Sequence, residues 1–122
     1  MTVSLHHMEE KKMVNTIDFN KDIARDYGLR ESVIATYLWE LLDRDLESIE
    51  RNGRVWTRIS QRMITVALPF MSVDMARRSL KKLAEEGIIV RDVFNDDKFD
   101  HTYWYTFTAY GNELLDDSRC FD

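Results

Sequence analysis

Four cationic side chains lie close together near the middle of the chain, and their spacing suits contact with a polyanion. They are Arg77, Arg78, Lys81 and Lys82. An arginine guanidinium can donate two parallel hydrogen bonds to guanine, and both arginine and lysine neutralise phosphates, which releases counterions. On a helix, the last three would share one face, with Arg77 on its flank. The spacing predicts that this face contacts duplex DNA. The alternative is a solvated basic face in which Arg77 makes a structural ion pair.

A helix over residues 72–86 would position these cations. Ser72 can cap its first turn by accepting a backbone N–H, and Asp74 places a negative charge near the positive end of the helix dipole. Gly87 can adopt the left-handed conformation that ends many helices. An apolar stripe at three- and four-residue steps predicts that the opposite face is buried. The stripe comprises Val73, Ala76, Leu80, Leu83 and Ala84.

Charge is distributed unevenly along the 122 residues. Residues 54–91 contain eight Lys or Arg against three Asp or Glu, a net charge of +5, whereas the whole chain carries −5, so the remainder carries −10. The negative total argues against a protein that coats nucleic acid indiscriminately. The single cysteine, Cys120, cannot form an internal disulfide, which favours an intracellular protein. No apolar run approaches the roughly 18 residues that a membrane span requires.

The other elements are predicted from apolar periodicity and turn residues. Predicted helices cover residues 19–28, about 30–49, 60–68 and 110–115. Predicted strands cover residues 55–59, 88–94 and 101–108, and the last two form a β-hairpin. Asp18 or Asn20 caps the first helix, Ser60 caps the third, and Pro69 prevents its continuation.

This order predicts an α+β fold that is mostly α: a winged helix-turn-helix with an extra N-terminal helix and a two-stranded β-hairpin wing. The expected organisation is a flexible leader over residues 1–17, a winged-helix domain over residues 18–115 and an acidic tail over residues 116–122.

The helical pattern over about residues 30–49 carries an unusually wide apolar stripe. Ala35 and Trp39 widen it beyond what one neighbouring helix usually covers. We expect the short preceding helix to pack there, and a homodimer contact is the alternative.

Aromatic side chains crowd the second strand of the predicted hairpin. Stacked aromatic rings can bind single-stranded nucleic acid. Alternation along a strand places Tyr103, Tyr105 and Phe107 on one face and Trp104 on the other. We favour core packing for the three that share a face, and a structural role for Trp39 and Trp56.

The sequence does not indicate catalysis. His101 has no nucleophile motif near it, Cys120 lies in the tail, and the four glycines form no phosphate-binding loop. His6 and His7 lack a third metal ligand nearby in sequence and are assigned to the leader. We therefore expect a protein that is not an enzyme and that holds no metal or cofactor.

Four stretches carry a resemblance to known proteins. They are NKDIARDYGLRESVIATYLWELL, GRVWTRIS, LPFMSVDMARRSLKKLAEEGIIV and FDHTYWYTFTAYGNELL. Together they resemble small winged-helix domains of phages and mobile elements, in particular the DNA-binding N-terminal domain of phage replisome organisers (DnaD-like replication proteins). The match covers about residues 19–115, and its most specific parts are Trp56, Pro69-Phe70 and residues 100–105.

This resemblance implies a non-catalytic DNA-binding protein of phage or mobile-element origin. Such a protein would act in replication or transcription control in the cytoplasm of a bacterial host cell. In that family the basic helix enters the major groove of double-stranded DNA and the hairpin wing touches the backbone. The residues expected to contact DNA are Arg58, Gln61, Arg62, Ser72, Asp74, Arg77, Arg78, Lys81, Lys82 and Lys98.

The predicted wing supports an alternative partner. It contains Asp92, Asp96, Asp97 and Asp100 against one lysine, and phosphate backbones repel such a tip. Phage winged helices can be reused as inhibitors of nuclease defence systems. The alternative hypothesis is therefore an anti-CRISPR-like inhibitor that imitates nucleic acid and binds a basic host protein such as a CRISPR effector. An acidic surface that only keeps the protein soluble explains the same charges.

Overall fold

The computed structural model describes residues 16–42, 44 and 46–116. Most of the predicted leader and the predicted tail after residue 116 lie outside these residues. The same holds for His6, His7 and Cys120, which the sequence assigned to those two segments.

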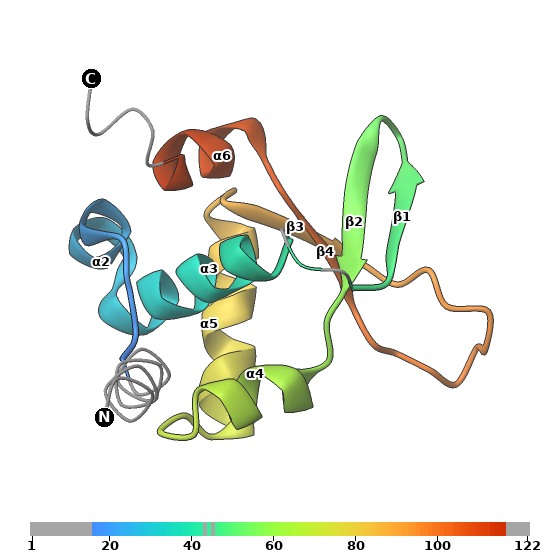
Figure 1. Ribbon diagram of the computed structural model, residues 1–122, viewed down its shortest axis with the longest axis horizontal. Coiled ribbons are helices and arrows are strands. Elements are labelled where there is room, and N and C mark those ends of the chain that lie inside the picture. Colours follow the sequence, from blue (N-terminus) through green and yellow to red (C-terminus); the bar gives the residue numbers. More distant parts are fainter. Residues whose placement is uncertain (1–15, 43, 45, 117–122) are drawn as a thin grey trace, which may run out of the picture.

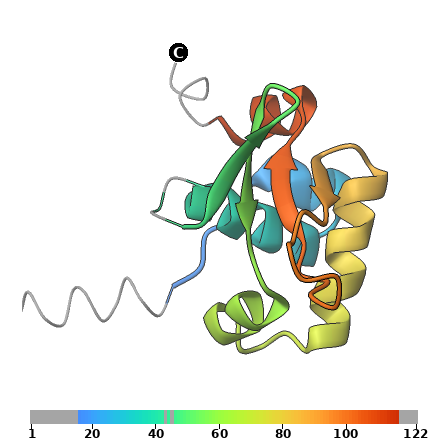
Figure 2. The same ribbon diagram turned by 90° about the vertical axis from the view of Figure 1, so that its right-hand side faces the viewer.

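The described residues form five helices and a four-stranded antiparallel sheet (Figure 1). The helices are α2 (Lys21–Tyr27), α3 (Leu29–Leu42), α4 (Gln61–Ala67), α5 (Val73–Glu85) and α6 (Ala109–Leu115). The strands are β1 (Ser48–Arg51), β2 (Arg54–Arg58), β3 (Ile89–Asp92) and β4 (Trp104–Phe107), in the spatial order β1-β2-β4-β3. Helix α5 contacts α3, α4 and β3, so it lies on the β3 side of the sheet, away from β1 (Figures 1 and 2).

Polar side chains start the helices where the sequence predicted caps. The side chains of Asn20, Ser60 and Ser72 accept backbone N–H groups in the first turns of α2, α4 and α5. Thr108 does the same for α6. Of the two caps considered for the first helix, Asn20 is the one used, and its side-chain amide also donates to the Leu114 carbonyl oxygen at 2.6 Å. This bond ties the start of α2 to α6.

The core lies between α3, α5 and the inner face of the sheet. Ala76, Leu80 and Leu83 of α5 are fully buried, as the stripe in the sequence predicted. They belong to one apolar cluster with buried residues of α3, β3 and β4. This burial fixes one face of α5 to the protein and leaves the other face exposed.

The prediction that one helix covers about residues 30–49 is wrong. Helix α3 ends at Leu42, and Ser48–Arg51 form β1. Strand β1 pairs with β2 through a two-residue turn at Asn52 and Gly53, whose φ angles of 55° and 75° suit the type I′ hairpin. Ile49 lies opposite Trp56 in this hairpin. Strand pairing with residues further along the chain therefore overrides the helical spacing of the apolar residues.

Trp39 is covered within the protein. Its ring packs edge-to-face against Phe107 of β4 at 5.3 Å between centroids. The sheet therefore helps α2 to cover the wide stripe of α3, and the homodimer contact remains a prediction.

Both faces of β4 are buried. Tyr105 and Phe107 belong to the main core, as predicted. Trp104 lies on the opposite face, is 3% exposed and packs near Phe94, which also contacts Trp56. The Trp104 indole donates to the Asn95 side chain at 2.8 Å. A stacking platform for single-stranded nucleic acid is excluded on β4, because its rings are not accessible.

Candidate nucleic-acid interface

Helix α5 presents its cations outward from the core. The side chains of Arg77 and Arg78 are 60% and 69% exposed, while Ser79 and Leu80 are buried. Lys81 is also exposed, one turn after Arg77. The amphipathic sequence of α5 thus produces an exposed basic face with accessible guanidinium groups.

The cations of α5 differ in their anionic partners. Asp74 accepts from Arg78 at 2.9 Å and lies 3.9 Å from Arg77. Lys82 is directed to the other flank, where its ammonium lies 4.0 Å from Glu31 of α3. Lys81 has no carboxylate partner among the residues that the structure describes. Of the predicted set, Lys82 is therefore the cation most clearly engaged in holding α5 to α3.

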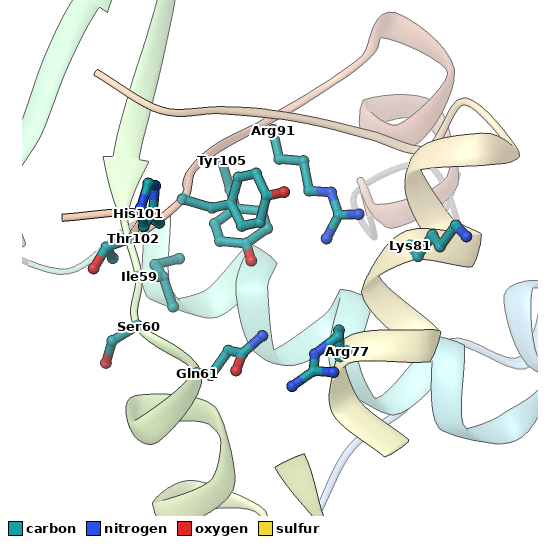
Figure 3. Close-up of a pocket in the computed structure, with 10 residues that line it drawn as sticks. Ile59, Ser60, Gln61, Arg77, Lys81, Arg91, His101, Thr102 and Tyr105 are labelled. Carbon is teal, nitrogen blue, oxygen red and sulfur yellow. The ribbon is translucent and has the colours of Figure 1, made fainter. Parts of the chain in front are cut away.

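A cleft of about 530 Å³ separates α5 from the sheet (Figure 3). Its walls come from α5, the start of α4, β3 and the segment leading into β4. The lining residues are Ile59, Ser60, Gln61, Arg77, Lys81, Arg91, His101, Thr102, Tyr103 and Tyr105. Figure 3 shows the side chains of Arg77, Arg91 and Gln61 pointing from three elements into the same space. The fold therefore adds a cation from β3 to two from α5.

Within the part of the chain that the structure describes, no carboxylate lines this cleft. The Arg91 guanidinium lies over the Tyr103 ring at 4.5 Å, a contact that holds it at the wall. Burial raises the pKa of Tyr105 to about 12, although the Arg91 guanidinium acts in the opposite direction. Tyr105 therefore remains a neutral hydroxyl at physiological pH, and the local charge of the cleft is positive.

Arg58 lies on the other face of the sheet. It is opposite Trp104 in the strand register, whereas its neighbour Thr57 is opposite Tyr105 on the cleft side. The Arg58 guanidinium forms an ion pair with Asp100 and lies 3.6 Å from Glu47. This placement separates Arg58 from the cations of the cleft and of α5, with which the sequence had grouped it.

The aspartates of the wing mostly bond within their own loop. Asp100 accepts from the backbone N–H and the hydroxyl of Thr102, at 3.0 and 2.7 Å. Asp92 accepts from the next backbone N–H, and Asp97 accepts from that of Phe99. Asp96 lies in the same loop and lines a hollow together with Arg58 and Glu47. These contacts explain the aspartates as loop-forming residues, and they give the acidic-surface hypothesis no specific support.

The remaining predicted contacts are spread over three places. Gln61 lines the cleft, and Arg62 is exposed on α4 beside it. The Ser72 hydroxyl accepts from the Met75 backbone N–H at 3.1 Å, so it caps α5. Lys98 lies near the tip of the wing, with its ammonium 5.3 Å from the Phe99 ring.

Replacing Asp100 with asparagine should lower the free energy of unfolding at pH 6. The hydrogen bonds from Thr102 and the ion pair with Arg58 hold the pKa of the Asp100 carboxyl below its ordinary value of 3.8. A carboxyl with a lowered pKa stabilises the fold above its ordinary value, and this contribution is lost as the pH falls through the lowered pKa. The difference between wild type and Asp100→Asn should therefore shrink below pH 3.8.

Denaturant unfolding at pH 6 and at pH 3 would check this expectation. Asp96→Asn removes the same charge from the same loop and should leave the free energy of unfolding nearly unchanged. A constant difference between wild type and Asp100→Asn at both pH values would contradict the assigned role.

Within the described residues, no group of three or more His, Cys, Asp or Glu side chains is arranged to hold a metal ion. Among the same residues, no helix is both long enough and apolar enough to cross a membrane.

The arrangement defines a winged-helix domain. Helices α4 and α5 form the helix-turn-helix, joined through Pro69, and β3 and β4 form the hairpin wing. No family model matches the chain, and no curated protein matches it in sequence.

A solved structure supports this fold. The crystal structure of a MarR/EmrR family transcriptional regulator from Acinetobacter sp. ADP1 aligns with a TM-score of 0.51 and 19% sequence identity. The alignment covers 98% of this chain and 71% of that chain. At this identity the likeness establishes the winged-helix fold, and it carries no evidence for the replisome-organiser family in particular.

Residue Arg91 was missed as a site residue by sequence reasoning. The sequence counted it only as part of the basic stretch of residues 54–91. Alternation along the predicted strand could have indicated this position. It puts Arg91 on the same face as Ile89, and in the strand register Ile89 lies opposite Phe107 while Arg91 lies opposite Tyr105. Arg91 becomes a candidate contact only because β3 packs beside α5.

Proposed function

We propose that the protein is a non-catalytic DNA-binding regulator that places α5 in the major groove of duplex DNA. The single observation that carries this proposal is the basic, exposed face of α5 beside a cationic cleft that no carboxylate of the described residues lines. A helix-turn-helix presents its second helix to the groove, and α5 occupies that position. The name of the similar structure, a transcriptional regulator, supports a role in transcription control.

Arg78 is the best candidate for direct contact with bases. Its guanidinium is exposed and is oriented by the Asp74 carboxylate at 2.9 Å. A fork held in this way can donate two hydrogen bonds to the O6 and N7 atoms of guanine, which discriminates by about 1–3 kcal/mol against the wrong base. Lys81, without a carboxylate partner among the described residues, would neutralise a backbone phosphate.

Two narrower forms of the proposal follow from the sequence. The resemblance to phage replisome organisers favours a phage or mobile-element protein, for which replication is an alternative to transcription control. A homodimer would present two copies of α5, so its preferred site would be palindromic, with half-sites about one helical turn apart.

Fluorescence anisotropy of labelled duplexes across a salt series tests the proposal. Binding should weaken steeply with salt, because each neutralised phosphate contributes about −0.9 to the slope of log K against log salt. Phosphate contacts at the cleft and along the exposed face of α5 predict a slope steeper than about −1. Absence of binding to random and genomic duplexes at low salt would contradict the proposal.

A further inference from the structure

The cleft beside α5 has the composition of an anion site. Three cations, Arg77, Lys81 and Arg91, line it from α5 and β3, and no carboxylate of the described residues lines it. Its volume of about 530 Å³ falls within the usual range of ligand clefts. Gln61 adds a neutral side-chain amide that can donate to an oxygen atom.

Two cations outside the cleft lie beside carboxylates. Arg58 is held by Asp100 and Glu47, and Lys82 lies beside Glu31. By contrast, Lys81 and Arg91 have no carboxylate partner within the described part of the chain, and Arg77 reaches only Asp74 at 3.9 Å. Arg77 and Arg91 point into a cleft that no carboxylate of the described residues lines, so their charge is available to an external anion.

Arg91 is fixed before any anion arrives. Its guanidinium is only partly exposed and lies over the Tyr103 ring at 4.5 Å. A guanidinium stacked on an aromatic ring has less conformational freedom and can still donate N–H groups to a phosphate. The stacking therefore lowers the entropy cost of binding an anion at Arg91.

We propose that this cleft binds one phosphate group, and that its source is a backbone phosphate of the duplex that α5 contacts. This proposal rests on the proposed function for its source of phosphate. It places the backbone contact of the wing at its base, at Arg91 in β3, whereas the tip of the wing carries aspartates. The acidic tip then remains outside the contact, which removes the conflict between its charge and that of DNA.

Replacing Arg91 with glutamine tests the proposal. The variant should weaken binding to a preferred duplex and to a random duplex by the same factor, about 5- to 10-fold near 0.1 M salt. It should also make the slope of log K against log salt less steep by about 1, as expected for a lost phosphate contact. Arg91→Lys keeps the charge but loses the fork, so it should restore most of the slope and only part of the affinity.

Arg54→Gln is the matched control, because it removes one arginine charge from an exposed position in β2 that lies outside the cleft and outside α5. It should change the slope by much less than 1. Circular dichroism melting of each variant verifies folding, and Arg91→Lys keeps the test decisive if Arg91→Gln is destabilised. If both Arg91 variants bind the duplex with wild-type affinity and with an unchanged slope of log K against log salt, the cleft proposal is overturned. The proposed function would remain intact.

A second arm separates the two sources of phosphate. Inorganic phosphate is titrated into the wild-type protein while the Nε–Hε NMR signals of Arg77 and Arg91 are followed. Saturable shifts that are lost when duplex is already bound support a shared phosphate site. Saturable shifts in a protein that binds no duplex would overturn DNA as the source and would also contradict the proposed function.

Discussion

Replacing Arg78 and Lys81 together with alanine should weaken binding to a preferred duplex about 100-fold, with little change in the free energy of unfolding. Loss of a two-pronged contact to guanine costs about 1–3 kcal/mol, and loss of a phosphate contact adds to it, so about 2.7 kcal/mol is expected in total. Both side chains are exposed, and the ion pair of Arg78 with Asp74 is a surface pair that contributes little to stability. Anisotropy and denaturant unfolding would measure the two quantities.

The matched control is Arg25→Ala with Arg54→Ala. This double variant changes the net charge by the same amount, but Arg25 pairs with Asp22 and Asp26 on α2, and Arg54 is exposed at the start of β2. Duplex affinity should fall far less than in the first pair. Equal losses in the two pairs would show that binding depends on net charge alone and would contradict the assignment of α5 as the reading element.

Gly111→Ala should destabilise the fold by about 2–3 kcal/mol, the largest effect expected from the addition of one methyl group. A Cβ at this position would overlap the Ile88 carbonyl oxygen and lie 3.1 Å from a ring carbon of Phe107. Overpacking against side chains costs about 1–3 kcal/mol, and here the nearest atom is backbone, which cannot turn away. Alanine's better helix propensity offsets up to about 1 kcal/mol of this cost.

Asn112→Ala provides the comparison in the same helix. Asn112 is exposed on α6, so its replacement should change the free energy of unfolding by less than about 0.5 kcal/mol. Thermal unfolding of both variants would measure the difference. Wild-type stability in Gly111→Ala would mean that α6 does not pack closely on the start of β3.

Local signals made the helix-turn-helix predictable. Ser60 and Ser72 act as caps, and Gly87 has a φ of 76° just after α5. Most of the apolar stripe of α5 is buried as its spacing predicted, but its first member, Val73, is 45% exposed because it lies at the start of the helix. Each of these features depends on residues within a few positions along the chain. Local chemistry therefore sufficed for the elements that carry the proposed reading face.

Features that depend on distant pairing could not be predicted in the same way. The residues of β1 have the apolar spacing of a helix, and only their pairing with β2 shows that they form a strand. Arg58 was predicted to contact DNA, but in the fold its guanidinium pairs with Asp100, which is 42 residues away in sequence. Arg91 became a site candidate only because β3 packs beside α5. In all three cases the sequence identifies the residue, but only the folded structure shows which distant residue lies beside it.

The most direct test of the central claim is a titration of the ¹⁵N-labelled protein with a short duplex, followed through the backbone amide shifts. We predict that the largest shifts occur in α5, at the start of α4 and in β3 around Arg91. Residues 95–100 at the tip of the wing and the exposed surface of α2 should shift least. Largest shifts on α2, α6 or the wing tip, with α5 unchanged, would contradict the account.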